Sequence, residues 1–481
     1  MDKESFPPSL KGKKVLLTTE SLGPVNGVSR TTGSLIEYLR RNGVDLVVVA
    51  PQFEGAQQPQ QQVANLRLPG YPLPYNPDLT LVYPFRLKDV YKPTTQPDIV
   101  YVASPASLGF QLLLYMRQLR KPPVVLLNFQ TDLSAYSEII FPGPLSRWAV
   151  WLLATVQGFL FSDPAVHTIF YPSSCILDYL KKAGAPVARA VKLGRGVDTT
   201  LFNPSRRDEA YRKEIAPDGE IILVCVCRLA PEKGFEFLAV AAAKLVKEKL
   251  PFKLLIVGGN RNPVVESRIH RLFDHVRDHV VFTGFLTGES LARAYASGDL
   301  FLHCSITETF GLVVLEAMAS GLPVIARDQG GPSDIVRHQE TGYLVPPNDV
   351  EQFVALVRQV SLDSQLLSSL AVAARAYAED TTWEKINRRV AWQMANAVEQ
   401  REHEKRVSMA GHSRWRAAYE KVKDRTVYAL VERLRLIAAL GLVCFMWMIS
   451  VVPLIIHGSR VIPRGLAYIC GLAGLAGTKC T

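Results

Sequence analysis

The chain reads IILVCVCRLAPEKG over residues 221–234, and this stretch decides the fold. Its first seven residues form an apolar run of strand length, and residues 235–248 follow with a helical pattern. A buried strand that leads into a helix is typical of a parallel sheet covered by helices. Arg228 and Lys233, at the carboxyl end of this strand, are suited to bind a diphosphate, although a helix-capping surface turn is the alternative.

Strands and helices alternate along the chain in two series. The first series predicts strands at 14–18, 45–50, 98–103, 123–128, 165–171 and 190–193, with a helix at 29–42. The second predicts strands at 221–227, 253–257, 280–283, 300–304, 324–326 and 342–345, with helices at 235–248, 264–276, 290–296 and 308–318. This order predicts an α/β protein with two Rossmann-like domains, at 1–203 and 204–382. Ligands of such sheets bind at the carboxyl ends of the strands, so we expect the site in a cleft between the domains.

The second motif, ETFGLVVLE, begins at Glu308 and ends at Glu316. Eight residues are a little over two helical turns, so we expect both carboxylates on one side of a helix. Gly311 permits close approach of a ligand to the backbone. The amides of Phe310, Gly311 and Leu312 are then expected to point at an anion. The alternative is an amphipathic helix with two solvated glutamates.

Three further features invite a functional interpretation. The loop GPVNGV, which contains Gly27, follows the first strand and is able to present amides to a phosphate. Gly258 starts a Gly-Gly pair that lacks the full dinucleotide fingerprint, so we expect it to line a donor pocket. His167, inside an apolar strand, is expected to be a core histidine, and His303 is open to either interpretation.

The context of Arg228 and Lys233 in Pro-Glu-Lys-Gly, and the Glu-x7-Glu pair with its Thr-Phe-Gly, resemble the glycogen-synthase-like group of retaining glycosyltransferases. The resemblance covers residues 12–395. It implies the GT-B fold, with two Rossmann-like domains facing across a cleft and a last helix, at 383–400, that crosses back to the first domain. It also implies an enzyme that moves a hexosyl group from a nucleotide-sugar substrate to an acceptor.

The resemblance assigns roles residue by residue. Arg228 and Lys233 would bind the donor diphosphate, Glu308 would contact the donor sugar, and Glu316 would hold the ribose hydroxyls. The remaining donor-binding groups would be Gly27, Gly258, Phe310, Gly311 and Leu312. These groups would stabilise charge on the leaving diphosphate. Since the chain has no Asp-x-Asp, we expect no metal and no cofactor.

A finer likeness lies in PVNGVSRT at 24–31, QTD at 130–132 and GRGVDT at 194–199. These stretches look like GDP-mannose-dependent α-mannosyltransferases and sulfoquinovosyl-diacylglycerol synthases. They imply transfer of mannose from GDP-mannose to a lipid or glycolipid, with a UDP-sugar-dependent glycolipid synthase as the alternative.

Many relatives carry a His at the position that follows Phe129, where this chain has Gln130-Thr131-Asp132. We therefore assign no catalytic His. The residues expected on the acceptor or sugar side are Asn26, Gln130, Asp132 and Arg195, and Asp132 joins Glu308, Arg228 and Lys233 in the catalytic set.

Two functions of other classes compete with this interpretation. A Rossmann-type oxidoreductase needs a full Gly-x-Gly-x-x-Gly after the first strand, which is missing. A non-catalytic membrane-tethered scaffold has no need of the two cations and two glutamates. The net charge of +11 suits anionic partners such as nucleotide phosphates or acidic lipids, and we expect no nucleic acid partner.

The C-terminal part of the sequence changes character. Residues 401–435 form a charged linker with ten Lys and Arg, and residues 436–456 then run for 21 positions without a charge. That length spans a bilayer, so we expect a membrane anchor within 436–481, with a buried helix of an extra domain as the alternative. The basic flank places the catalytic domains on the cytosolic side, on the endoplasmic reticulum if the host is eukaryotic. Seven scattered cysteines fit that reducing compartment.

Overall fold

The computed structural model describes residues 5–23, 27–52, 63–73, 76–82, 90, 96–119, 121–130, 144–260, 262–305 and 308–410. The expected membrane anchor and the charged linker beyond Ala410 lie outside these residues, as do Asn26 and Asp132. Among the described helices, none is long and apolar enough to cross a membrane.

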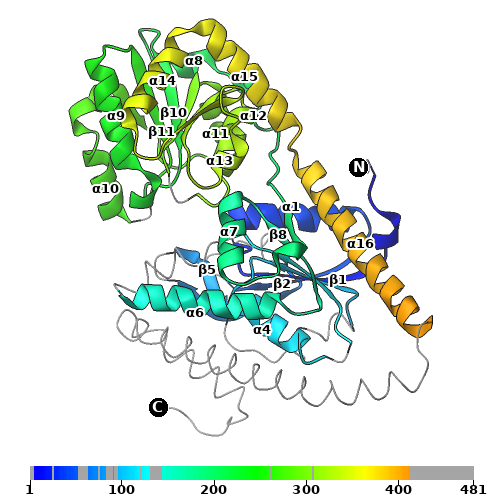
Figure 1. Ribbon diagram of the computed structural model, residues 1–481. Coiled ribbons are helices and arrows are strands. Elements are labelled where there is room, and N and C mark those ends of the chain that lie inside the picture. The colour runs from blue at the N-terminus through cyan, green and yellow to red at the C-terminus, as the bar shows by residue number, and fades with distance from the viewer. Residues whose placement is uncertain are drawn as a thin grey trace. The chain divides into compact units, whose positions relative to one another are not determined.

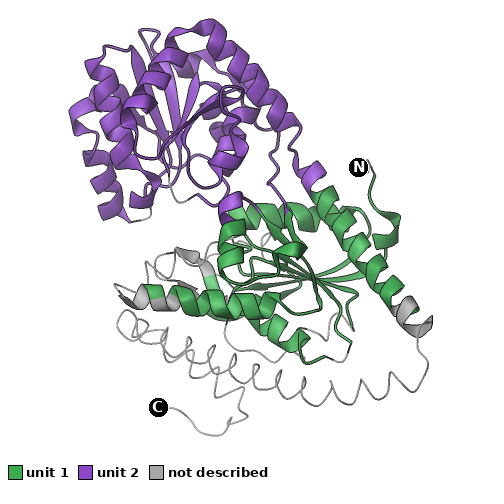
Figure 2. Cartoon of the chain, viewed as in Figure 1, with its two compact units in different colours: residues 1–171, 177–191, 387–481 green, residues 172–176, 192–386 purple. Residues whose placement is uncertain are grey.

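The chain divides into two compact units (Figure 2). Unit 1 comprises Met1–Tyr171, Leu177–Val191 and Asn387–Thr481, and unit 2 comprises Pro172–Ile176 and Lys192–Ile386. The cleft expected between the two domains stays a prediction.

The longer segment of unit 2 begins at Lys192, whereas the sequence predicted a domain boundary at residue 204. The reason is that Val197 and Phe202 are buried in the core of unit 2. The Val197 amide also donates to the carbonyl of Thr381, which ties this stretch to the end of the same unit.

Unit 1 is built on a seven-stranded sheet in the order β3-β2-β1-β6-β7-β8-β9. Its strands are β1 (Lys14–Thr19), β2 (Asp45–Pro51), β3 (Leu66–Leu68), β6 (Ile99–Ala103), β7 (Val124–Asn128), β8 (Val166–Tyr171) and β9 (Ala190–Lys192). β1 lies between β2 and β6 in parallel register, with Val15 opposite both Leu46 and Ile99. The order of the strands therefore reverses between β1 and β6, and this switch point is where ligands of doubly wound sheets bind.

The helices of unit 1 follow the strands as expected for a doubly wound domain. They are α1 (Gly27–Arg41), α4 (Ser107–Met116), α6 (Pro144–Phe161) and α7 (Ser174–Lys182), which belongs to unit 1 from Leu177 onward. Leu35 and Leu39 of α1, one turn apart, are buried, and such a side chain contributes about 1.5–3 kcal/mol. Three strands were not predicted from the sequence: β3 and the antiparallel pair β4 (Gly70–Leu73) and β5 (Asn76–Val82).

Unit 2 has a six-stranded parallel sheet in the order β12-β11-β10-β13-β14-β15. The strands are β10 (Ile221–Val226), β11 (Phe252–Val257), β12 (Val280–Phe282), β13 (Leu300–His303), β14 (Val324–Arg327) and β15 (Gly342–Val345). The helices are α8 (Glu209–Ile215), α9 (Phe235–Lys247), α10 (Pro263–Arg271), α11 (Gly288–Ala296), α12 (Leu312–Ala319), α13 (Pro332–Ile335), α14 (Val350–Leu362) and α15 (Ser364–Glu379).

The sheet of unit 2 lies between two layers of helices (Figure 1). Leu223 packs on the face that α9 and α14 cover, and its neighbour Val224 packs on the face that α11, α12 and α15 cover. The alternation of side chains along β10 thus gives each face its own core, which explains the continuous apolar run in the sequence.

One predicted helix begins later than expected. The sequence predicted a helix over 308–318, but α12 begins at Leu312 because Gly311 is left-handed, with φ 101°. Glu308 therefore lies in the preceding loop, and the expectation that Glu308 and Glu316 share one helix is wrong. The helix expected over 264–276 also ends early, at Arg271, and a 3-10 segment, Asp274–His279, follows it.

The long helix expected at 383–400 is α16 (Trp383–Ala410), which runs ten residues further. Its residues up to Ile386 belong to unit 2, and those from Asn387 onward belong to unit 1. Within unit 1, Asn387 donates to Ser34 Oγ at 2.9 Å, and the indole of Trp392 donates to the carbonyl of Ser5 at 2.9 Å.

Candidate active site

The first motif is the stretch at residues 221–234, and its second half, residues 227–234, forms the loop that follows β10. Pro231–Lys233 is one turn of 3-10 helix, and Gly234 ends it in a left-handed conformation with φ 76°. A Cβ at Gly234 would clash with the carbonyl of Cys304, just after β13. Glycine is required there on both counts, so the loop that carries Arg228 and Lys233 is held close to the end of β13.

Lys233 is paired with the first glutamate of the second motif. Its Nζ lies 2.7 Å from Oε2 of Glu308, and the two side chains are 14% and 23% exposed. Burial acts to lower the pKa of Lys233, but the Glu308 carboxylate outweighs it and raises that pKa. Burial acts to raise the pKa of Glu308, but Lys233 and then His303 hold it below its usual value. Both groups are therefore charged at neutral pH.

Arg228 is more accessible than Lys233. Its side chain is 56% exposed and its Nη2 lies 3.4 Å from Oε1 of Glu232, one turn along. An exposed pair of this kind is worth about 0–1 kcal/mol, so a diphosphate can displace Glu232 at little cost. The loop thus offers one exposed cation and one nearly buried cation at the end of the same strand.

Phe310 and Gly311 precede α12, which begins at Leu312. Val314 donates to the carbonyl of Gly311, so the amides of Gly311 and Leu312 are among those that the first turn of a helix leaves for other partners. Phe310 is buried, and the guanidinium carbon of Arg195 lies 5.9 Å from its ring centroid. The sequence analysis placed Arg195 with the acceptor-side residues, but it belongs to unit 2.

Glu316, the second glutamate, lies inside α12 and is 2% exposed. Tyr295 of α11, itself fully buried, donates its hydroxyl to Oε2 of Glu316 at 3.1 Å. A carboxylate fixed in this way is pre-organised to accept hydrogen bonds from hydroxyl groups.

Gly258, which the sequence predicts to line a donor pocket, lies directly after β11. Its φ is 141°, and a Cβ there would clash with the carbonyl of Cys227. Its amide donates to the carbonyl of Gly284 at 2.9 Å. The backbone of β11 therefore approaches the base of the Arg228 loop so closely that only glycine fits.

The two histidines differ in environment. His167 is partly buried and bonded on both ring nitrogens, to Thr168 at 2.9 Å and to Gln400 at 2.6 Å. His303 is 4% exposed, and burial lowers its pKa to about 4, so the ring is neutral beside Glu308 and Lys233. Its Nδ1 has no hydrogen-bond partner among the described residues.

Two candidate residues belong to unit 1. Gly27 is the first residue of α1 and is exposed, and Thr31 donates its hydroxyl to the carbonyl of Gly27 at 2.8 Å. Gln130 follows β7 and is 6% exposed, with its Nε2 3.5 Å from Oγ1 of Thr32. The expected partners Asn26 and Asp132 lie outside the described residues.

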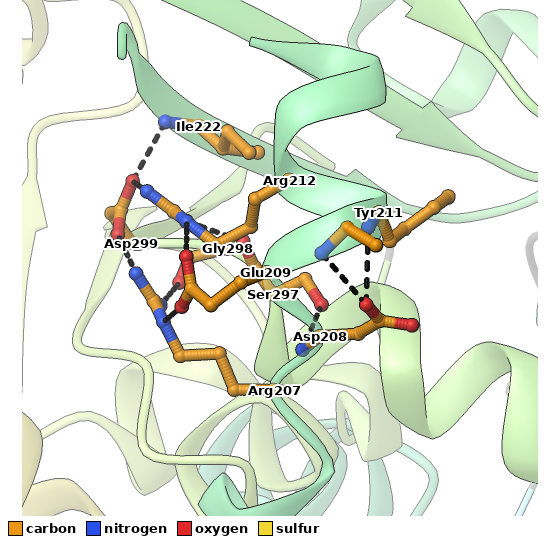
Figure 3. A network of polar contacts seen from close by, with 10 residues as sticks. Arg207, Asp208, Glu209, Tyr211, Arg212, Ile222, Ser297, Gly298 and Asp299 are labelled. Carbon is orange, nitrogen blue, oxygen red and sulfur yellow. Dashed lines mark hydrogen bonds and ion pairs between the residues drawn. The ribbon is translucent and has the colours of Figure 1, made fainter. Parts of the chain in front are cut away.

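A separate polar network lies at the opposite, amino-terminal edge of the sheet of unit 2 (Figure 3). Asp299, just before β13, accepts from Arg212 at 3.0 Å, from Arg207 at 3.3 Å and from the amide of Ile222 at 2.9 Å. These bonds fix α8 to the sheet. Apart from Ile222, which contributes its backbone amide, no residue of this network lies in the two motifs, and the role of the network is structural.

Comparison with known proteins decides the family. Residues 206–377 match the family described as glycosyl transferases group 1, and residues 25–201 match glycosyltransferase family 4. The chain is 39% identical over 346 residues to a GDP-mannose-dependent α-mannosyltransferase of Mycolicibacterium smegmatis. The aligned residues cover 71% of this chain and 85% of the relative. The chain is a GT-B glycosyltransferase. It is also 31% identical over 401 residues to the sulfoquinovosyl transferase SQD2 of Arabidopsis thaliana, which covers 81% of this chain and 74% of that one.

Solved structures share the fold of this glycosyltransferase. HepE of Anabaena, in complex with UDP and glucose, superposes with a TM-score of 0.63 at 18% identity, covering 79% of this chain and 99% of that one. Sucrose-phosphate synthase of Thermosynechococcus elongatus gives 0.62 at 20% identity, covering 81% and 99%. At these identities the likeness is one of fold.

The residues that hold the Glu308 loop of the glycosyltransferase were not predicted from the sequence. The amide of Gly331 donates to the carbonyl of Glu308 at 2.7 Å, and a Cβ at Gly330 or Gly331 would clash with the backbone of that loop. Ser173 donates its hydroxyl to the carbonyl of Thr309 at 2.6 Å. The Gly-Gly-Pro that follows β14 was the available signal, whereas nothing near Ser173 in the sequence points to this contact.

The described residues contain no group of three or more His, Cys, Asp or Glu that could hold a metal ion. We expect the two cations of the first motif to bind the leaving diphosphate. That the transfer needs no metal stays a prediction.

Proposed function

We propose that this glycosyltransferase moves mannose from GDP-mannose to a lipid or glycolipid acceptor with retention of configuration. The main support for the proposed donor site is the ion pair between Lys233 and Glu308 at the end of β10, beside the more exposed Arg228. The mannosyl specificity is supported by the relatives at 39% and 36% identity, both GDP-mannose-dependent α-mannosyltransferases.

The roles of the residues follow from their chemistry. Arg228 and Lys233 bind the diphosphate and offset the charge that develops as the sugar leaves. Glu308 gives up part of its contact with Lys233 to the phosphate and accepts from a hydroxyl of the donor sugar. Glu316, held by Tyr295, accepts the ribose hydroxyls. The acceptor hydroxyl enters on the same face as the leaving phosphate, whose oxygen takes the proton.

A UDP-sugar-dependent glycolipid synthase is the second candidate. It is supported by the 31% identity to SQD2 over 81% of the chain. Both candidates use the same cations and the same Glu316, so they differ in the base and the sugar and share the chemistry at the diphosphate.

A donor panel tests the proposal. Purified full-length protein is supplied with labelled GDP-mannose, UDP-glucose or UDP-sulfoquinovose and with extracted membrane lipids, with and without EDTA. We expect the highest turnover with GDP-mannose and unchanged turnover in EDTA. Faster turnover of a UDP-sugar would establish the second candidate, and a loss in EDTA that Mn²⁺ restores would contradict the metal-free leaving-group site.

A further inference from the structure

Glu20 lies at the switch point of the sheet of unit 1. It directly follows β1, whose neighbour on one side is β2 and on the other β6, and the strand order reverses between β1 and β6. The carboxyl end of a doubly wound sheet at such a point is the usual place for a ligand. Glu20 is nevertheless only 4% exposed, so a titratable group is buried where a ligand is expected.

Only half of the Glu20 carboxyl group is used by the fold. Oε1 accepts from the amide of Gly109 at 2.9 Å and from that of Ala106 at 3.3 Å, at the start of α4. Oε2 is buried and has no hydrogen-bond partner among the described residues. Burial raises the pKa of Glu20 to about 8, against the bonds from the start of α4. A buried polar atom without a partner is costly, and such an atom in a native protein calls for an explanation.

A second, independent observation lies two strands away on the same edge. Gln130 follows β7, is 6% exposed, and its Oε1 also has no partner among the described residues. Oδ1 of Asn128, the last residue of β7, is also buried without a hydrogen-bond partner among the described residues. β6 lies between β1 and β7, and Ser104, the residue that follows β6, has φ 57°. That conformation is strained for a residue other than glycine.

The unpaired atoms include both a donor and acceptors, and this selects the ligand. Because the pKa of Glu20 is raised to about 8, its carboxyl group carries a proton at neutral pH and Oε2 can donate, whereas the amide oxygens of Gln130 and Asn128 accept. A hydroxyl group both donates and accepts, whereas a phosphate oxygen only accepts. Arg67, a cation whose guanidinium reaches the loop after β1, already donates to the carbonyls of Leu22 and Pro51. The edge is therefore suited to hydroxyl groups rather than to an anion.

We propose that Glu20 is an acceptor-binding residue, whose Oε2 and the Oε1 of Gln130 hydrogen-bond the hydroxyl groups of an uncharged, sugar-bearing lipid headgroup. This rests on the proposed function, since it names the class of acceptor for that transfer. Donor binding by unit 2 is separate from it, so the two ideas fail in different experiments.

The test compares kinetic parameters of full-length variants with GDP-mannose as donor. Vesicles contain either monoglucosyl-diacylglycerol, which has an uncharged sugar headgroup, or phosphatidylinositol, which has a phosphate. The variants are Glu20→Ala, Glu20→Gln and Gln130→Leu, and the matched control is Glu37→Gln, an exposed glutamate on α1 of the same unit. The dissociation constant of GDP-mannose and the melting temperature are measured for each variant.

We expect the KM for the glucosyl lipid to rise at least tenfold in Glu20→Ala and in Gln130→Leu. Glu20→Gln should return it to within about threefold of wild type, because the amide keeps Oε1 for α4 and offers a polar group in place of Oε2. Donor affinity should stay within twofold throughout, and Glu37→Gln should match wild type.

Other outcomes contradict the assignment. A lower melting temperature in Glu20→Ala with an unchanged acceptor KM would show that Glu20 only caps α4. Turnover of phosphatidylinositol alone, or of neither lipid, would overturn the class of acceptor. Failure of wild-type protein to bind GDP-mannose would instead reject the proposed function.

Discussion

Lys233 and Glu308, 75 residues apart in the chain, form an ion pair at 2.7 Å in unit 2 of this glycosyltransferase. The loop of Lys233 is fixed by Gly234 against the end of β13, and the loop of Glu308 is fixed by Gly331. The pair brings together the two motifs to which we assign the binding of the donor.

Loss of either cation should slow transfer. Lys233→Ala and Arg228→Ala each remove a charge-assisted contact with the leaving diphosphate, and about 2–4 kcal/mol of transition-state stabilisation is expected to be lost. The effect of Lys233→Ala should be the larger, because it also leaves Glu308 without its partner. Steady-state kcat/KM measures both, with Lys213→Ala, an exposed lysine on α8, as the control. Wild-type kcat/KM in either variant would refute its role at the phosphate.

Glu20 should make the stability of the protein fall as the pH rises. The pKa of Glu20 is about 8 in the folded state, above the unfolded value of 4.5. As the pH rises between these two values, the unfolded state loses the proton first, and the free energy of unfolding falls. Glu20→Gln removes this ionisation and should raise the melting temperature more at pH 8 than at pH 5. Glu37→Gln serves as the control. Equal shifts at the two pH values would mean that the Glu20 carboxyl group is not perturbed.

Asp299 should matter for stability but not for donor recognition. Asp299→Ala removes one of the two carboxylates that Arg207 and Arg212 share, the other being Glu209, and takes away the hydrogen-bond acceptor of the Ile222 amide. Breaking a fully buried ion pair costs about 3–5 kcal/mol of unfolding free energy. Because the Arg207 side chain is 39% exposed, we expect the smaller loss of about 2–3 kcal/mol. Urea unfolding measures it, and Glu209→Ala, a neighbour in the network at 71% exposure, should cost less than about 1 kcal/mol.

Removal of residues 411–481 should release the protein from membranes. That segment contains the 21 uncharged positions 436–456, which are long enough to span a bilayer. A stop after Ala410 keeps α16 whole, including Glu402, which pairs with Lys13 at 3.4 Å. We expect the full-length chain to sediment with membranes and the truncated chain to stay in the supernatant with its GDP-mannose affinity intact. A full-length chain that already remains in the supernatant would contradict the anchor.

The alternation of strands and helices could be predicted because it depends on local pattern. Buried parallel strands need apolar runs, and β1, β2, β7 and β10 have them in the sequence, so their bounds came within one or two residues. The short β3 and the β4–β5 pair were missed because their pairing joins segments with little apolar pattern of their own. The start of α12 was misplaced because one glycine conformation outweighed the helical spacing of the two glutamates.

The sequence by itself determined the two motifs, the class of the fold and the family, since these depend on residue identity and spacing along the chain. Only the tertiary structure decided that Glu308 lies outside the helix and pairs with Lys233, that Tyr295 holds Glu316, and that Ser173 holds the Glu308 loop. It alone revealed the unpaired oxygens of Glu20 and Gln130. The physical reason is that hydrogen bonding and burial depend on what the fold brings near a side chain, and residues distant in sequence supply those neighbours.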